Sequence, residues 1–202
     1  MNKSQLLKSL KNKGFSKQIL DAFSEVPRKN FIPENLKPRA YEDTALPIGK
    51  GQTISQPYTI AVMLQLLELK QKNKVLEIGS GCGYVLALIS QITKSKVYGI
   101  EIIKELAEKS KQNLKDYENI KIYNKNGANG LKEHSPYDKI LISAACKEIP
   151  KIILNQLKNN GILVAPVDSD YGQDLVAIHR RGDKFIEKQR IPGFVFVRFV
   201  NN

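Results

Sequence analysis

The sequence predicts an α/β protein with a doubly wound, mostly parallel sheet, an antiparallel C-terminal hairpin and an N-terminal helical cap. Three observations support this prediction. A short apolar strand, a glycine-rich loop and a helix follow one another without a break over residues 74–90. A second strand then ends in an acid, Glu101, roughly 20 residues beyond the loop. Strands and helices alternate along most of the remaining chain, which is the pattern of a doubly wound sheet.

The segment Lys74–Ser90, KVLEIGSGCGYVLALIS, is the centre of this prediction. Its first apolar run is too short for a typical helix and predicts a buried strand. Gly79, Gly81 and Gly83 follow, and they precede apolar residues with helical spacing. Glycines let a ligand approach the backbone closely, and a helix N-terminus offers unpaired N–H groups. An ordinary tight turn would use the same residues, but with Glu101 in place the pattern favours a nucleoside-cofactor site, in which this acid binds ribose hydroxyls.

The other elements follow from the spacing of apolar residues. Helices are predicted at residues 4–12, 16–25, 56–69, 103–114 and 149–157. Strands are predicted at residues 95–102, 120–123, 138–143 and 161–167, and antiparallel strands at residues 175–179, 185–189 and 195–200. Ligands bind beyond the carboxyl ends of the strands in such sheets, so Gly79, Glu101, Asn126 and Ser143 are expected to converge. The sequence leaves two roles open for Ser143: contact with a ligand, or packing alone.

The N-terminal part of the chain differs in character from the rest. Its two short helices are expected to cover the sheet. Residues 27–57 are rich in proline, glycine and polar residues, which predicts a long irregular segment, and such segments in compact domains are usually functional. The 202 residues suffice for one sizeable core, so residues 1–202 are predicted to form a single domain, with residues 1–55 as helical cap and active-site loop.

Composition limits the partners and the compartment. The net charge of +12 favours anionic partners, but the lysines are spread between acids and asparagines, so a solvated surface is favoured over a nucleic-acid site. The two cysteines and two histidines lack metal-ligand spacing, and no metal is predicted. Cys82 is interpreted as a small packing residue rather than a reactive thiol. The chain start lacks a signal peptide's apolar core and no run could span a bilayer, so a cytoplasmic protein without membrane contact is expected.

Several segments together resemble one family. The form G-x-G-x-G preceded by an acid, in VLEIGSGCGY, resembles motif I of the S-adenosylmethionine-dependent methyltransferases. ALPIGKGQTISQPYTIAVMLQLL (Ala45 to Leu67) resembles the signature loop and helix of the protein-L-isoaspartate O-methyltransferases. VPRKNFIP, YDKILISAACKEIPKIILNQLKNNGILVAPV and the closing VRFV resemble the same family in the same order. The resemblance covers nearly the whole chain and implies a Rossmann-like methyltransferase fold.

The resemblance also implies a chemistry and its residues. The implied cofactor is S-adenosylmethionine, with S-adenosylhomocysteine as product, and the implied substrates are isoaspartyl-containing proteins and peptides. Ser55 matches the family's active-site serine, and Glu101 matches its ribose-binding acid. The other implied cofactor contacts are Thr53, Ile54, Gly79, Ser80, Gly81, Asn126 and Gly127. The family usually has Gly-Asp-Gly where this chain has Lys125, Asn126 and Gly127; an asparagine carbonyl accepts from the adenine amino group but lacks the charge.

The implied reaction is a protein repair. Methylation of the isoaspartyl carboxylate gives an ester, and in this family the ester then collapses to a succinimide that reopens partly to normal aspartate. The carboxylate is ionised at neutral pH, since its ordinary pKa is roughly 3.3 to 3.7, so no general base is needed. Positioning and exclusion of water should supply most of the acceleration. Ser55 is expected to hydrogen-bond the substrate carboxylate, although a serine in such a loop also suits a local hydroxyl-to-backbone turn.

Two other classes of function remain as alternatives. One is an RNA or small-molecule methyltransferase on the same fold, suggested by the net charge of +12. The other is a cofactor-binding module without catalysis, suggested by Asn126 in place of the usual acid. No long amphipathic stripe is left over for a partner, so a monomer is the default expectation.

Overall fold

The strand that precedes the glycine loop lies at the centre of the sheet. In the computed structural model, which describes residues 1–200, all four residues of β3 (Val75–Ile78) are buried. β3 pairs in parallel with β4 (Val97–Glu101) on one side and with β6 (Tyr137–Ile142) on the other. A parallel strand covered on both faces needs a nearly continuous apolar run, which explains the composition of VLEI.

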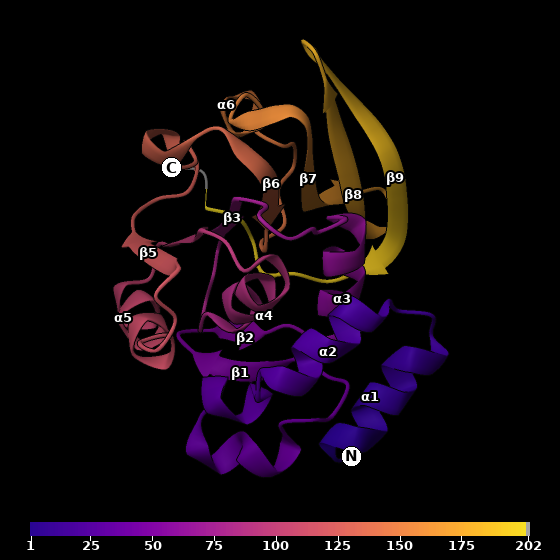
Figure 1. The fold of residues 1–202 in the computed structure, drawn as a ribbon, viewed down its shortest axis with the longest axis vertical. Helices are drawn as coiled ribbons and strands as arrows, with labels where there is room; N and C mark the ends of the chain where they lie inside the picture. Colours follow the sequence, from indigo (N-terminus) through magenta and orange to yellow (C-terminus); the bar gives the residue numbers. More distant parts are fainter. Residues whose placement is uncertain (201–202) are drawn as a thin grey trace.

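Within residues 1–200 the sheet has seven strands in the order β5, β4, β3, β6, β7, β8, β9. β5 (Ile120–Asn124) and β7 (Leu157–Ser169) extend the parallel part on its two sides. β8 (Gly172–Arg181) and β9 (Lys184–Phe194) add an antiparallel hairpin, which projects from one corner of the ribbon in Figure 1. The predicted doubly wound sheet with an antiparallel C-terminal hairpin is therefore confirmed.

Helices cover the sheet and form most of the N-terminal region. The α-helices are α1 (Lys3–Asn12), α2 (Lys17–Glu25), α3 (Pro57–Leu66), α4 (Tyr84–Thr93), α5 (Lys104–Asn113) and α6 (Lys151–Leu154). Short 3-10 helices are η1 (Arg28–Phe31), η2 (Glu34–Arg39) and η3 (Lys132–His134). Figure 1 shows α1, α2 and α3 grouped together beside the strands, as expected of an N-terminal helical cap.

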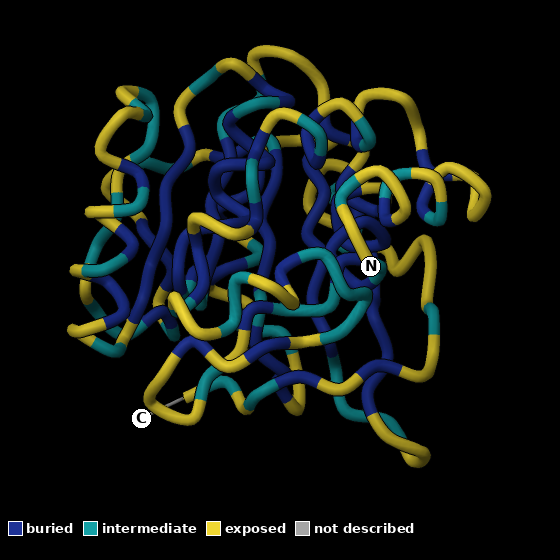
Figure 2. The backbone as a smooth tube through the Cα atoms, turned by 90° about the horizontal axis from the view of Figure 1, so that it is seen from below, coloured by how far each residue is buried: buried dark blue, intermediate teal, exposed yellow. Residues whose placement is uncertain are grey.

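Alternate residues of the central strands face two different cores. Val75 and Val97 belong to a large apolar cluster that also contains the buried faces of α1 to α4. Leu76 and Ile140 belong to a smaller cluster on the other face, together with Ile153 of α6. This alternation follows from the two-residue repeat of a strand. Figure 2 shows the result, with buried backbone in the interior and exposed segments mainly at the turns around it.

Three predicted elements need correction. Residues 195–200 form no strand of the sheet; they cross the carboxyl edge as an extended segment with one isolated bridge between Ala145 and Arg198. The helix predicted at residues 149–157 is only Lys151–Leu154, because Leu157 already pairs with Tyr137 at the irregular start of β7.

The third correction concerns the segment predicted to be irregular. Residues 27–57 contain η1, η2 and a two-stranded hairpin of β1 (Leu46–Gly49) and β2 (Gln52–Ile54). The turn between the strands places Lys50 at φ 54° and Gly51 at φ 70°. Two successive positive φ angles are what a tight hairpin turn requires, but lysine gives little indication of this conformation in a sequence.

Gly83 provides a test of how closely the glycine loop packs. It has φ 87°, and an added Cβ would lie 2.6 Å from Leu114 Cδ1 and closer still to Ser110 Oγ. Gly182, in the β8–β9 turn, has φ 61° and no atom within 4 Å of such a Cβ. Gly182→Ala should cost about 1 kcal/mol of unfolding free energy through backbone strain alone. Gly83→Ala should cost about 3 kcal/mol, since overpacking adds to the same strain. Urea unfolding of both variants measures the difference, and equal losses would contradict the packing described here.

Candidate active site

The glycine loop is fastened to the end of β4 through its backbone. The N–H groups of Gly79 and Ser80 donate to the carbonyl of Ile100 at 2.8 and 3.0 Å. The N–H of Gly81, the following residue, donates to Oε2 of Glu101 at 2.8 Å. The loop therefore has a fixed shape before any ligand binds, and one of its anchors is the acid predicted to bind ribose.

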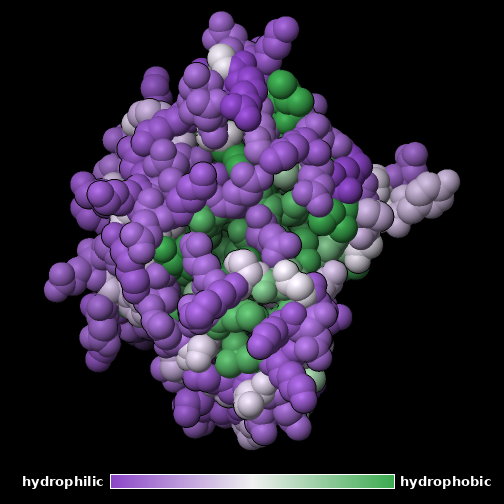
Figure 3. Space-filling view, turned by 45° about the vertical axis from the view of Figure 1, so that its right-hand side comes forward, coloured by the Kyte–Doolittle hydropathy of each residue, from purple (hydrophilic) through white to green (hydrophobic). Residues whose placement is uncertain are grey.

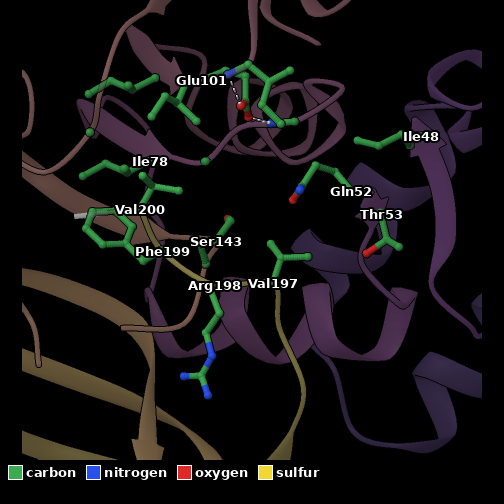
Figure 4. Close-up of a pocket in the computed structure, with 17 residues that line it drawn as sticks. Ile48, Gln52, Thr53, Ile78, Glu101, Ser143, Val197, Arg198, Phe199 and Val200 are labelled. Carbon is green, nitrogen blue, oxygen red and sulfur yellow. Dashed lines mark hydrogen bonds between the residues drawn. The ribbon is translucent and has the colours of Figure 1, made fainter. Parts of the chain in front are cut away.

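Glu101 is held at the edge of a pocket. Its second oxygen, Oε1, accepts from the N–H of Ile103 at 2.9 Å. Each carboxylate oxygen has two lone pairs, so both oxygens keep acceptor capacity after these bonds. Figure 4 draws the two bonds and shows Glu101 at one side of the pocket, across from Thr53 and Gln52. A ribose with two hydroxyl donors fits this acceptor.

The pocket lies beyond the carboxyl ends of β3, β4 and β6. Its empty volume, open solvent included, is about 750 Å³. Five parts of the chain form its walls: the glycine loop with the ends of β3 and β4, the β1–β2 hairpin, the loop after β5, the end of β6 and the C-terminal segment. The lining residues are Ile48, Gln52, Thr53, Ile78, Gly79, Gly81, Ile100, Glu101, Ile102, Ile103, Gly127, Ser143, Ala144, Val197, Arg198, Phe199 and Val200.

An open cleft adjoins this pocket on the side of Ser55. The cleft is lined by residues around Ser55 and Tyr58 and by residues 191–197. A smaller cavity beneath the glycine loop contains Ser55, Glu77 and Ser80 in its wall. Thr53 and Ser143 line all three spaces, so the pocket and the cleft meet between these two hydroxyls. Figure 3 shows one face of the molecule on which apolar side chains gather in a hollow among hydrophilic ones.

Glu77, the acid before the glycine loop, is buried with little compensation. It is 1% exposed, and its Oε1 accepts from the Ser143 hydroxyl at 2.7 Å. Its Oε2 is buried and has no hydrogen-bond partner among the described residues. Burial raises the pKa of Glu77 to about 8; the Ser143 hydrogen bond opposes this rise, and the nearby Glu101 charge adds to it. A buried acceptor without a donor beside a glycine loop suits a cationic or hydrogen-bonding group of a ligand.

The structure brings most of the predicted site residues together. Thr53, Gly79, Gly81, Glu101 and Gly127 line the pocket. Ile54, Ser55 and Ser80 line the cavity beside it.

Asn126 directly precedes Gly127, but it is not among the residues that line the pocket, the cleft or the inner cavity. Its Oδ1 accepts from the N–H of Ala128 at 2.8 Å. The predicted contact of this carbonyl with an adenine would share the same oxygen.

Sequence reasoning did not include several residues that form the site. Ile48 and Gln52 belong to the unpredicted hairpin, and Figure 4 shows the Gln52 side chain directed into the pocket. Val197 and Phe199 belong to the C-terminal segment that was predicted as a strand. The closing VRFV was a signal for this segment, because it formed part of the family resemblance, but its alternating pattern pointed to the sheet.

The described residues contain no cluster of metal ligands, and both thiols are buried. Among the described residues, no group of three or more His, Cys, Asp or Glu side chains could hold a metal ion. Both cysteines are free and buried, and burial raises the pKa of each thiol to about 11, so Cys82 is a packing residue rather than a thiolate. No helix in residues 1–200 is both long and apolar enough to cross a membrane.

The fold and the site together define a class of protein. A doubly wound sheet, a glycine loop anchored by an acid of the next strand, and a pocket that meets an open cleft are the features of a Rossmann-like methyltransferase. The model of the protein-L-isoaspartate(D-aspartate) O-methyltransferase (PCMT) family matches residues 1–202, and the chain belongs to this family.

Individual relatives agree with this assignment. The protein-L-isoaspartate O-methyltransferase of Methanothrix thermoacetophila is 41% identical over 99% of this chain and 95% of its own length. A solved protein-L-isoaspartate O-methyltransferase matches 99% of this chain and 67% of that chain, with a TM-score of 0.91 and 27% identity. A crystal structure from Plasmodium falciparum, described as an enzyme of this kind in complex with S-adenosyl-L-homocysteine, matches all of both chains with a TM-score of 0.87 and 29% identity.

The burial of Glu77 predicts a pH-dependent stability. Its folded pKa of about 8 lies above the ordinary value, so the folded state holds a proton that the unfolded state has lost. The resulting destabilisation is absent below about pH 4.3, grows as the pH rises, and is complete above the folded pKa. The free energy of unfolding of Glu77→Gln, taken relative to that of wild type, should therefore be a few kcal/mol higher at pH 8.5 than at pH 4.5. Urea unfolding of the ligand-free protein at both pH values measures this.

A second variant tests the cause of the shift. The Ser143 hydroxyl lowers the pKa of Glu77, so Ser143→Ala should raise that pKa further and steepen the loss of stability with rising pH. A difference between wild type and Glu77→Gln that stays constant from pH 4.5 to 8.5 would contradict the assignment.

Proposed function

We propose that this protein is a protein-L-isoaspartate(D-aspartate) O-methyltransferase, which uses S-adenosylmethionine to methylate the free carboxylate of isoaspartyl residues in damaged proteins. One observation carries the proposal beyond family membership: a cofactor-sized pocket meets an open cleft between the hydroxyls of Thr53 and Ser143, and Ser55 lines the cleft and the inner cavity beside them. Hydroxyl groups donate hydrogen bonds to a carboxylate without neutralising it. The substrate polypeptide would bind in this cleft.

The cofactor contacts are proposed from the family resemblance, and most of the residues concerned line the pocket or the cavity beside it. Glu101 would bind the ribose hydroxyls, and Gly79, Ser80 and Gly81 would pack against the methionine part. Thr53 and Ile54 of the hairpin would close over it from the other side, and Gly127 with its neighbour Asn126 would lie beside the adenine. The unpartnered oxygen of Glu77 supports a hydrogen-bonding occupant of the inner cavity. When bound, S-adenosylmethionine supplies an electrophilic methyl group on a positively charged sulfur.

The residues of this chain need only align and shield the reactants. The substrate carboxylate is already ionised at neutral pH, so no group has to remove a proton from it. An oxygen of this carboxylate forms the new bond to the methyl carbon while the bond from carbon to sulfur breaks, and both formal charges disappear. Loss of charge is favoured where water is excluded, and the apolar wall of Ile48, Val197 and Phe199 excludes it.

Ser55 is proposed to orient the carboxylate. Ser55 lines both the cleft and the inner cavity. It follows Thr53 and Ile54, which are proposed to face the cofactor. A hydrogen bond from its hydroxyl would hold one carboxylate oxygen and leave the other in line with the methyl group. Ser143 reaches the same junction but already donates to Glu77.

The proposal extends to a cytoplasmic monomer that acts without nucleic acid. Two free, buried cysteines suit a reducing compartment. Exposed large apolar side chains are scattered, and three of them, Ile102, Val195 and Val200, lie at the pocket and the cleft. The named relatives favour a protein substrate over the RNA and small-molecule alternatives.

Methyl transfer to a matched pair of peptides tests the function. One peptide carries isoaspartate and the other normal aspartate at the same position, and labelled S-adenosylmethionine is the donor. We expect base-labile label on the isoaspartyl peptide alone, because only isoaspartate has a free α-carboxylate at this position. In normal aspartate the α-carboxyl group is part of the main chain. Equal labelling of both peptides, or cofactor binding without any labelling, would refute the proposal.

Replacement of Ser55 tests its role. A hydrogen bond to a charged group is worth roughly 1.5–3 kcal/mol, so Ser55→Ala should lower kcat/KM for the isoaspartyl peptide about 10- to 100-fold. Binding of S-adenosylhomocysteine, measured by calorimetry, should change little. Ser90→Ala is the matched control, since Ser90 lies in α4 and donates to Asn119. Unchanged peptide kinetics in Ser55→Ala at saturating cofactor would exclude this role.

A further inference from the structure

Arg28 is a fully buried cation whose hydrogen bonds go to main-chain carbonyls. Its exposure is 0%. Nη1 donates to the carbonyl of Ala40 at 2.8 Å and reaches that of Glu42 at 3.5 Å. Nη2 donates to the carbonyls of Thr44 and Ser55 at 3.0 and 3.1 Å. Burying a guanidinium is costly, and desolvation lowers the pKa of Arg28, so an arrangement of this kind is expected to serve a purpose beyond filling space.

The carbonyls that Arg28 binds lie at the open end of the β1–β2 hairpin. Thr44 stands two residues before β1, and Ser55 directly follows β2. A single nitrogen, Nη2, therefore joins the two ends of the hairpin. The other nitrogen holds the chain that leads into it, at Ala40.

The hairpin also buries the apolar side chains of Leu46, Ile48 and Ile54 in the core, but these contacts are not directional. Its tip is joined to α5 by an ion pair between Lys50 and Glu105 at 2.6 Å, in which both side chains are more than half exposed. Exposed ion pairs contribute little. Arg28 is therefore the principal polar anchor of a hairpin that carries Thr53 into the cofactor pocket and precedes Ser55 in the cleft.

We propose that Arg28 is a positioning residue for methyl transfer: its guanidinium fixes the backbone of Ser55 so that the Ser55 hydroxyl meets the substrate carboxylate. This inference rests on the proposed function and adds a residue to that site. Arg28 does not touch the pocket or the cleft itself, and it acts through Ser55. Arginine suits the task because its planar fork presents several N–H donors in fixed directions, whereas a lysine ammonium is a single compact centre.

The consequence for catalysis follows from the tolerance of such alignments. A displacement of about 1 Å at a positioning group can lower a rate about 100-fold. Arg28→Lys keeps the charge and some donors but cannot reach both Thr44 and Ser55 with the same geometry. We expect Arg28→Lys to lower kcat/KM for the isoaspartyl peptide at least about 10-fold at saturating cofactor. Arg28→Met, which keeps the volume but no donor, should lower it further.

A double variant separates positioning from general destabilisation. If Arg28 acts through the Ser55 hydroxyl, Arg28→Lys should change the activity of Ser55→Ala by no more than about 2-fold. The same loss in both backgrounds would overturn the proposal, because a merely structural effect does not depend on Ser55. Wild-type kinetics in Arg28→Lys would overturn it as well.

The control is another buried cation that lies away from the site. Lys139 in β6 is 7% exposed, and its pKa is lowered to about 8 by burial. Lys139→Met should leave peptide kinetics unchanged. Hydrogen exchange provides a reading that does not need activity: Arg28→Lys should speed exchange in residues 44–55 selectively, and Lys139→Met should not.

These measurements also distinguish the two proposals. If the wild-type protein fails to methylate the isoaspartyl peptide, the proposed function is wrong, and exchange in residues 44–55 still decides whether Arg28 holds the hairpin. Faster exchange there supports the anchoring. Unchanged exchange in Arg28→Lys overturns it, whatever the substrate proves to be.

Discussion

The shared carboxyl edge of three parallel strands determines where the functional side chains lie. Ile78 at the end of β3 pairs in register with Ile100 on β4 and with Ile142 on β6. The residues that follow, the glycine loop, Glu101 and Ser143, are therefore neighbours in space although they are distant in the sequence. A slip of one residue in any of these pairings would turn the adjoining side chains to the opposite face and separate them. The pairing of the sheet thus specifies the chemistry of the site.

Two acids at this edge serve different purposes because their surroundings differ. Glu101 accepts two backbone N–H groups, so it both shapes the glycine loop and presents acceptors to the pocket. Glu77 lies inside the sheet, where a single hydroxyl is its donor and burial raises its pKa to about 8. The sequence contains the same residue type at both positions. The donors around each side chain depend on tertiary packing, and they determine what the side chain can do at this edge.

The parts of the protein that were predictable are those with a local cause. β3, the glycine loop, α4 and Glu101 follow from apolar spacing and glycines, and Ser55 followed from the family resemblance. The hairpin was missed because Lys50 occupies a conformation that lysine rarely adopts. Residues 195–200 alternate like a strand and are indeed extended, but alternation does not identify the partner. The amide of Gln173 pairs with both backbone groups of Phe196 and takes the place of a neighbouring strand.

This extended segment forms one wall of the site, so the site depends on the contacts that hold the segment in place. The carbonyl of Val197 accepts from the N–H of Ala145, and the N–H of Phe199 donates to the carbonyl of Ala145, which lies two residues after Ser143 and beyond the end of β6. Gln173 belongs to β8, and the ion pair of Arg198 with Asp168 is largely exposed, so it adds little to these contacts. One wall of the pocket and of the cleft therefore depends on β8 being in place. The antiparallel hairpin at the edge of the sheet is consequently part of the proposed site, because it supports the segment that closes the pocket proposed for the cofactor and borders the cleft proposed for the substrate.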